Sequence, residues 1–231
     1  MATLSSVLGA AALAPEAEEV RVEERAEVVV LLHGLGRTRL SMAPMAWGLE
    51  RAGYEVVNWG YSSVCCTIEE LGEQLEDDLR RWELDGATVH FVGHSLGNLI
   101  VRWVLAENPG VRVGRVVMLA PPNQGSHEAN RYAPWLGWIL KPLADLRTQP
   151  DRAASYPPLP AYTEVGVIAG RDDGKVSIPE TLVAGMTDHV VVPAAHTFLM
   201  LRPDVWRHTL EFLREGHFQR PEVRGAGQFS S

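Results

Sequence analysis

The apolar positions of the chain fall into short runs that alternate with amphipathic segments. Each run is bounded by turn residues and is short enough to be a buried strand. Six such strands are expected, at residues 27–34, 54–61, 88–93, 114–122, 164–170 and 189–195. Strands that alternate with helices form a parallel sheet with helices packed on its faces. The pattern therefore predicts an α/β fold.

The segments between the strands carry apolar residues at helical spacing. The expected helices are residues 41–52, 67–84, 98–110 and 203–215. The second has the clearest signature, because Thr67 can cap its first turn and Glu70 completes a capping box. Its apolar residues recur every three or four positions, at Ile68, Leu71, Leu75, Leu79 and Trp82.

One interval, about residues 127–162, breaks this alternation. It is too long for a helix–strand connection and rich in Pro, Trp and Leu. We expect an insertion there with a short helix around residues 133–146, forming a cap at the strand ends. The remaining chain is expected to be a leader over residues 1–26, one domain over 27–215, and a loose tail over 216–231.

Composition narrows the choice of partners. The formal net charge of −8 argues against nucleic acid or an anionic membrane surface as the main partner. The only cysteines, Cys65 and Cys66, are adjacent, so a bond between them would be strained. With no spaced Cys/His set either, neither disulfides nor a metal is expected to hold the fold.

The first fourteen residues are small and apolar but lack the basic segment of an export signal. No segment reaches the roughly 20 apolar residues that span a bilayer. We expect a soluble, cytoplasmic protein without stable membrane insertion, and export stays open as the alternative. The sequence leaves the oligomeric state open.

Candidate chemistry begins at "VGHSLGN", where Ser95 stands between a predicted strand and a predicted helix. G-x-S-x-G in this setting is typical of a nucleophile elbow. Gly93 and Gly97 fit it because the turn brings strand and helix too close for side chains. A serine that merely caps a helix would satisfy the same pattern, so the motif alone does not decide.

A catalytic serine needs a base, and the base needs an acid that orients it. In α/β proteins of this kind the acid and then the histidine follow the serine, each just after a strand. His196 follows the sixth expected strand, and Asp172 and Asp173 follow the fifth. We favour Asp173, because Gly174 directly after it permits a sharp turn toward the histidine.

An oxyanion hole requires backbone donors beside the serine. The amide of Leu96 directly follows Ser95, and the glycine-rich turn "HGLGRT" would bring the amide of Leu35 close to it. These two amides are the expected oxyanion donors.

Four segments carry a family resemblance: "VVVLLHGLG", "VGHSLGN", "LAPPNQGS", and "IAGRDDGKVS" followed by "AAHTF". Together they resemble α/β-hydrolases of the lipase/esterase type, in particular small bacterial lipases and the inositol-deacylase-like group. The resemblance implies a minimal α/β-hydrolase fold, with a mostly parallel six-stranded sheet and a small cap. It also implies Asp173 as the acid, since the family places its acid directly before a glycine.

The chain departs from the family at two positions. Asn98 stands where many relatives have a second glycine. Phe198 stands where some larger relatives have an aspartate that binds calcium, so no calcium is expected.

The expected function is hydrolysis of carboxylic esters with apolar acyl chains, by Ser95, His196 and Asp173 and without a cofactor. The expected partner is a small-molecule ester or lipid. A thioesterase, an amidase, an acyltransferase and a non-catalytic ligand-binding protein remain alternatives. Trp135 and Trp138 of the insertion could cover the acyl group, or could instead pack the insertion onto the core. Trp59, after the second expected strand, could also face the acyl group.

Overall fold

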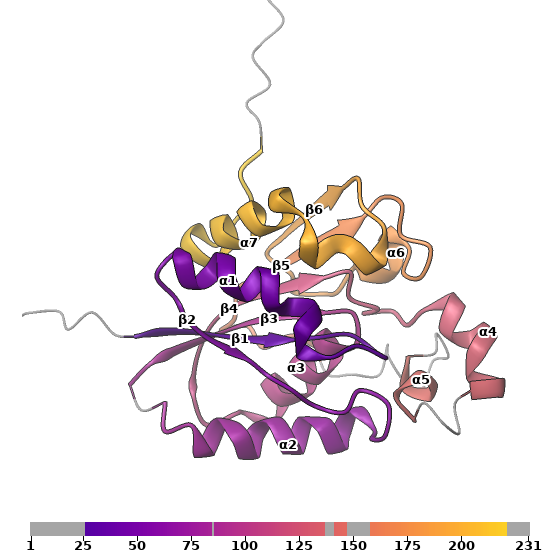
Figure 1. The fold of residues 1–231 in the computed structure, drawn as a ribbon, viewed down its shortest axis with the longest axis horizontal. Coiled ribbons are helices and arrows are strands. Elements are labelled where there is room, and N and C mark those ends of the chain that lie inside the picture. Colours follow the sequence, from indigo (N-terminus) through magenta and orange to yellow (C-terminus); the bar gives the residue numbers. More distant parts are fainter. Residues whose placement is uncertain (1–25, 85, 137–140, 147–157, 221–231) are drawn as a thin grey trace, which may run out of the picture.

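The computed structural model describes residues 26–84, 86–136, 141–146 and 158–220. Six parallel strands form one sheet in the order β2-β1-β3-β4-β5-β6, which confirms the predicted α/β architecture (Figure 1). The strands are β1 (Glu27–Leu32), β2 (Glu55–Asn58), β3 (Thr88–His94), β4 (Arg112–Leu119), β5 (Val165–Gly170) and β6 (Asp188–Val192).

Helices cover both faces of the sheet (Figure 1). One face carries α1 (Ala43–Arg51), which the 3₁₀ helix η1 (Arg39–Met42) precedes, and α7 (Pro203–Glu215). The other face carries α2 (Ile68–Arg81) and α3 (Leu96–Glu107). The capping box predicted for α2 is present, since the Thr67 hydroxyl accepts from the Glu70 amide and the Glu70 carboxylate accepts from the Thr67 amide.

The strand order creates a topological switch point between β1 and β3. The chain runs from β1 to β2 at the edge and then returns across β1 to β3, so the connections of β1 and β3 leave in opposite directions. The carboxyl ends of strands at such a switch point leave a crevice that binds ligands in open α/β sheets. Leu35 and Ser95 follow these two strands closely, so both lie at the crevice.

The insertion differs from the single helix expected around residues 133–146. The chain instead forms α4 (His127–Leu136) and a separate short helix α5 (Lys141–Asp145). An additional helix, α6 (Ile178–Thr181), follows β5, and the 3₁₀ helix η3 (His196–Leu201) follows β6. Strand β2 is also shorter than expected, and the rings of Trp59 and Tyr61, which follow it, stack on each other.

Two further expectations need correction. Cys65 and Cys66 are joined by a disulfide bond, although their adjacency had argued against one. The end of the domain also lies beyond residue 215, because the Phe218 side chain is buried and its amide donates to Asp188. The leader over residues 1–25 and the tail from residue 221 lie outside the described residues. Within the described ranges no helix is long and apolar enough to cross a bilayer.

Candidate active site

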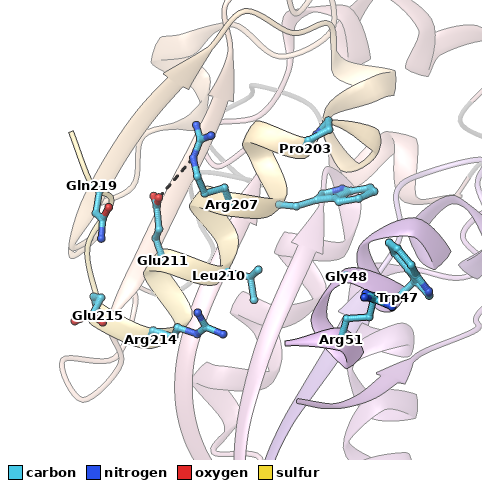
Figure 2. Close-up of a pocket in the computed structure, with 11 residues that line it drawn as sticks. Trp47, Gly48, Arg51, Pro203, Arg207, Leu210, Glu211, Arg214, Glu215 and Gln219 are labelled. Atoms are coloured by element: carbon cyan, nitrogen blue, oxygen red, sulfur yellow. Dashed lines mark ion pairs between the residues drawn. The ribbon is translucent and has the colours of Figure 1, made fainter. Parts of the chain in front are cut away.

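A pocket of about 530 Å³ opens at the carboxyl ends of the central strands. Ser95, His196 and Leu35 are among the residues that line it. A second cavity, of about 480 Å³, is lined by Trp47 of α1 and Leu210 of α7, and Arg207 beside it forms an ion pair with Glu211 (Figure 2). None of the residues expected in the site lines that second cavity, so the pocket at Ser95 is the candidate active site.

Ser95 occupies a strained turn between β3 and α3. Its backbone has φ 52° and ψ −117°, a region that residues other than glycine rarely adopt. The two flanking glycines make this turn possible: a Cβ on Gly93 would lie 2.9 Å from the Asn98 amide nitrogen, and one on Gly97 would lie 2.7 Å from the Leu32 carbonyl oxygen. The steric reason expected for these glycines is therefore confirmed.

Asn98, the departure from the family pattern, holds the turn in place. Its Nδ2 donates to the Ser95 carbonyl at 3.1 Å and to the Leu119 carbonyl at 3.0 Å. The Leu119 carbonyl also accepts from the Ser95 amide at 2.9 Å. The side chain is fully buried against Gly93, where a Cβ would displace it. Asn98 thus links the carbonyl of Ser95 to that of Leu119, the last residue of β4.

Replacing Asn98 by alanine is expected to lower the free energy of unfolding by about 1–2 kcal/mol, because two buried hydrogen bonds are lost. Urea unfolding of the wild type and the variant measures this difference. Gln74→Ala, on the exposed face of α2, is the control and should change stability by no more than about 0.5 kcal/mol. Equal stability of the two variants would contradict the role given to Asn98.

Asp173 and His196 are in direct contact. Asp173 Oδ2 lies 2.7 Å from His196 Nδ1, and Asp173 Oδ1 accepts from the amides of Lys175 at 2.8 Å and Val176 at 2.9 Å. A carboxylate only accepts, so the shared proton belongs to Nδ1, and Nε2 of a neutral His196 is left with a free lone pair. Asp172, the other candidate acid, is exposed and does not line the pocket. The arrangement suits a histidine that acts as a base.

His94 fixes the loop that carries His196. It is buried, its Nε2 lies 3.0 Å from the His196 carbonyl oxygen, and the two rings are 4.9 Å apart. Burial, followed by the neighbouring His196, holds the pKa of His94 well below its usual value. His94 is therefore neutral at pH 7 and donates Nε2–H to that carbonyl.

Acidification is expected to destabilise the fold between pH 7 and pH 5.5. The unfolded chain takes up a proton on His94 near pH 6.5, whereas folded His94 does not, so stability is complete above that pH and falls below it. Burial also lowers the pKa of His33 and His90, which adds to the same slope. Thermal unfolding at pH 7.5 and 5.5 measures the effect.

His94→Gln is the matched variant for this pH effect, because its amide can still donate to the His196 carbonyl but does not titrate. Its Tm should depend less on pH than that of the wild type over the same interval. An identical slope in the two proteins would show that His94 does not cause the pH effect.

Glu180 connects the loop that follows Asp173 with the start of the insertion. The sequence alone did not predict this role for Glu180. The buried carboxylate accepts from the Ser177 amide at 2.6 Å and from the His127 amide at 2.8 Å. Ser126 adds a second link, since its hydroxyl donates to the Lys175 carbonyl at 2.6 Å. The S-x-x-E spacing of Ser177 and Glu180 is a capping-box signal that could have revealed α6. The contact with His127, 53 residues away, has no local signal.

Of the three tryptophans expected near the acyl group, Trp59 is the one whose side chain the structure describes. Trp59 is buried in the core, where its indole N–H donates to Asp78 at 2.9 Å, and it does not line the pocket. Trp135 belongs to α4, and Trp138 lies outside the described residues. The apolar part of the lining comes from other side chains, namely Leu35, Pro122, Ala129, Leu146 and Val176.

No protein-family model and no curated protein matches the sequence. Solved structures do resemble it. Lipase BlEst2 of Bacillus licheniformis, in its propeptide form, has a TM-score of 0.68 and 19% identity over 87% of this chain. The present chain spans 52% of that form and 90% of the mature form, which has a TM-score of 0.64 and 20% identity over 82% of this chain.

Two other similar structures differ in their stated activities. The metagenomic carboxyl esterase MGS0156 has a TM-score of 0.64 and 19% identity, over 77% of this chain and 67% of its own. YbtT, a type II thioesterase of the yersiniabactin pathway, has a TM-score of 0.57 and 16% identity, over 83% of this chain and 93% of its own. Together with the parallel sheet and its switch point, these similarities establish that the chain has the α/β-hydrolase fold found in lipases and esterases.

Proposed function

We propose that the protein is a serine hydrolase that cleaves carboxylic esters, with Ser95 as nucleophile, His196 as base and Asp173 as the acid that orients it. The observation that carries this proposal is the 2.7 Å contact between Asp173 and His196, since His196 lines the same pocket as Ser95. The strained backbone of Ser95 supports it, because a nucleophile elbow exposes its serine in this way.

The proposed reaction has two steps. Ser95 Oγ attacks the ester carbonyl carbon while its proton passes to His196 Nε2, and the amides of Leu35 and Leu96 stabilise the oxyanion. The carbon–oxygen bond to the alcohol then breaks, and His196 returns the proton to the leaving alcohol. Water, activated by the same histidine, attacks the acyl-enzyme and releases the acid and free Ser95. The apolar lining favours an apolar acyl chain.

Hydrolysis of short p-nitrophenyl esters and labelling by a fluorophosphonate probe test the proposal. Wild-type protein should cleave the esters and carry the label on Ser95, located by peptide mass spectrometry. A panel that adds matched thioesters, amides and alcohol acceptors separates the esterase from the thioesterase, the amidase and the acyltransferase. Protein that neither labels nor cleaves any of these substrates would refute the enzymatic proposal in favour of a binding protein.

A further inference from the structure

Two cationic side chains flank Ser95 in the pocket. Arg37 follows β1 on one side of β3, and Lys175 follows β5 on the other, so the sheet order places Ser95 between them. Both residues are exposed at the pocket, and within the described residues neither forms an ion pair. Cations on both sides of the candidate nucleophile are thus free to bind a ligand.

Both charges act at the reaction centre. Besides burial and His196, the positive charges of Arg37 and Lys175 contribute to the lowered pKa of His94, which is adjacent to Ser95. The two cations therefore act electrostatically on the side chain that precedes Ser95.

Two anionic groups belong to the same region, and one of them is buried. The Asp173 carboxylate is fully buried, and both its oxygens are engaged by His196 and by the amides of Lys175 and Val176. Glu128, in the first turn of α4, is the one carboxylate among the described residues that line the pocket. Among the charged side chains that line the pocket, two are cations and one is an anion, on a chain whose overall net charge is −8. The charged side chains that line the pocket are therefore cationic on balance.

We propose that the substrate carries an anionic group, a carboxylate or a phosphate, near the scissile ester, and that Arg37 and Lys175 bind this group while the apolar lining holds the rest. The inference rests on the proposed ester hydrolysis and specifies its substrate class. An arginine matches the oxygens of either anion with paired donors, and a lysine adds a mobile point charge. Two anchors on opposite sides of Ser95 also restrict how an ester lies over it.

Matched ester pairs test this selectivity. In one pair the carboxylate lies in the acyl part: the p-nitrophenyl monoester of adipic acid against p-nitrophenyl hexanoate. In the other the phosphate lies in the alcohol part: butyryl glycerol phosphate against monobutyrin. The wild type should have the higher kcat/KM for the anionic member of at least one pair, and the pair concerned identifies the position of the anion.

Arg37→Gln and Lys175→Gln should each lower the anionic-to-neutral ratio of kcat/KM by about fivefold, the size of one exposed charge pair. Lys175→Gln keeps the backbone amide that Asp173 needs. Arg39→Gln is the control, because Arg39 is exposed two residues further on and does not line the pocket; it should leave the ratio unchanged.

The outcomes separate the two proposals. Hydrolysis of the neutral esters with a ratio that all three variants leave unchanged would overturn the anionic substrate and keep the esterase. A wild type with the higher kcat/KM for the neutral member of both pairs would also overturn the anionic substrate and keep the esterase. Failure to hydrolyse any ester would overturn both.

Discussion

Replacing Ser95 by alanine is expected to lower kcat for ester hydrolysis by a factor of about 10⁵, close to the background of the remaining site. Without the hydroxyl there is no atom to form the acyl-enzyme, and His196 has no proton to accept from a nucleophile. Binding should survive, since the pocket walls and the proposed oxyanion amides are intact, so KM should change little. Single-turnover and steady-state kinetics on p-nitrophenyl esters measure both quantities.

The control for this loss is Ser126→Ala, a second serine in the same pocket. Its hydroxyl donates to the Lys175 carbonyl and is not placed to attack a substrate, so its removal should cost less than about tenfold in kcat. The fluorophosphonate label should disappear from Ser95→Ala and persist in Ser126→Ala. The reverse pattern would make Ser126 the nucleophile.

Asp173→Asn is expected to lower kcat by about 10⁴, as the corresponding change does in serine proteases, while leaving the fold intact. The amides of Lys175 and Val176 need an acceptor, so the oxygen of the new carboxamide must face them and its NH₂ group must face His196 Nδ1. Nδ1 then has to accept, which moves the ring proton to Nε2. The histidine would present a proton to Ser95 instead of a lone pair, and it could no longer act as a base.

The neighbouring Asp172 provides the matched control. Asp172→Asn makes the same chemical change on an exposed side chain, one residue earlier in the same loop, and kcat should stay within about twofold of wild type. Circular dichroism and Tm of both variants check that the loop is folded. A large loss in Asp172→Asn together with near-normal activity in Asp173→Asn would exchange the roles of the two residues.

Much of the fold was predictable because its signals are local. The capping box of Thr67 and Glu70 and the glycines around Ser95 act over a few residues, and each has the expected structural role. The strand ends that gather Ser95, Asp173 and His196 follow from parallel topology, since every carboxyl end lies on the same edge. Local pattern and topology together were sufficient to place the candidate site.

Some expectations failed because of contacts between distant segments, and others because a local pattern was ambiguous. Trp59 follows a strand that ends near the pocket, but a hydrogen bond to Asp78 in α2 holds its indole in the core. The two helices of the insertion could not be separated by apolar spacing alone, because the second half of residues 127–146 is mostly apolar. The link from Glu180 to His127 joins segments that no short motif connects.

That link has a consequence for protein engineering. Because Glu180 and Ser126 bond the start of the insertion to the loop of Asp173, the insertion cannot be exchanged as an independent module. A transplanted segment that begins at residue 124 would remove the Ser126 hydroxyl and the His127 imidazole, and with them two side-chain bonds that hold the loop of the acid. A graft that keeps residues 123–130 native and replaces only later residues of the insertion would alter substrate range while preserving the geometry of the acid.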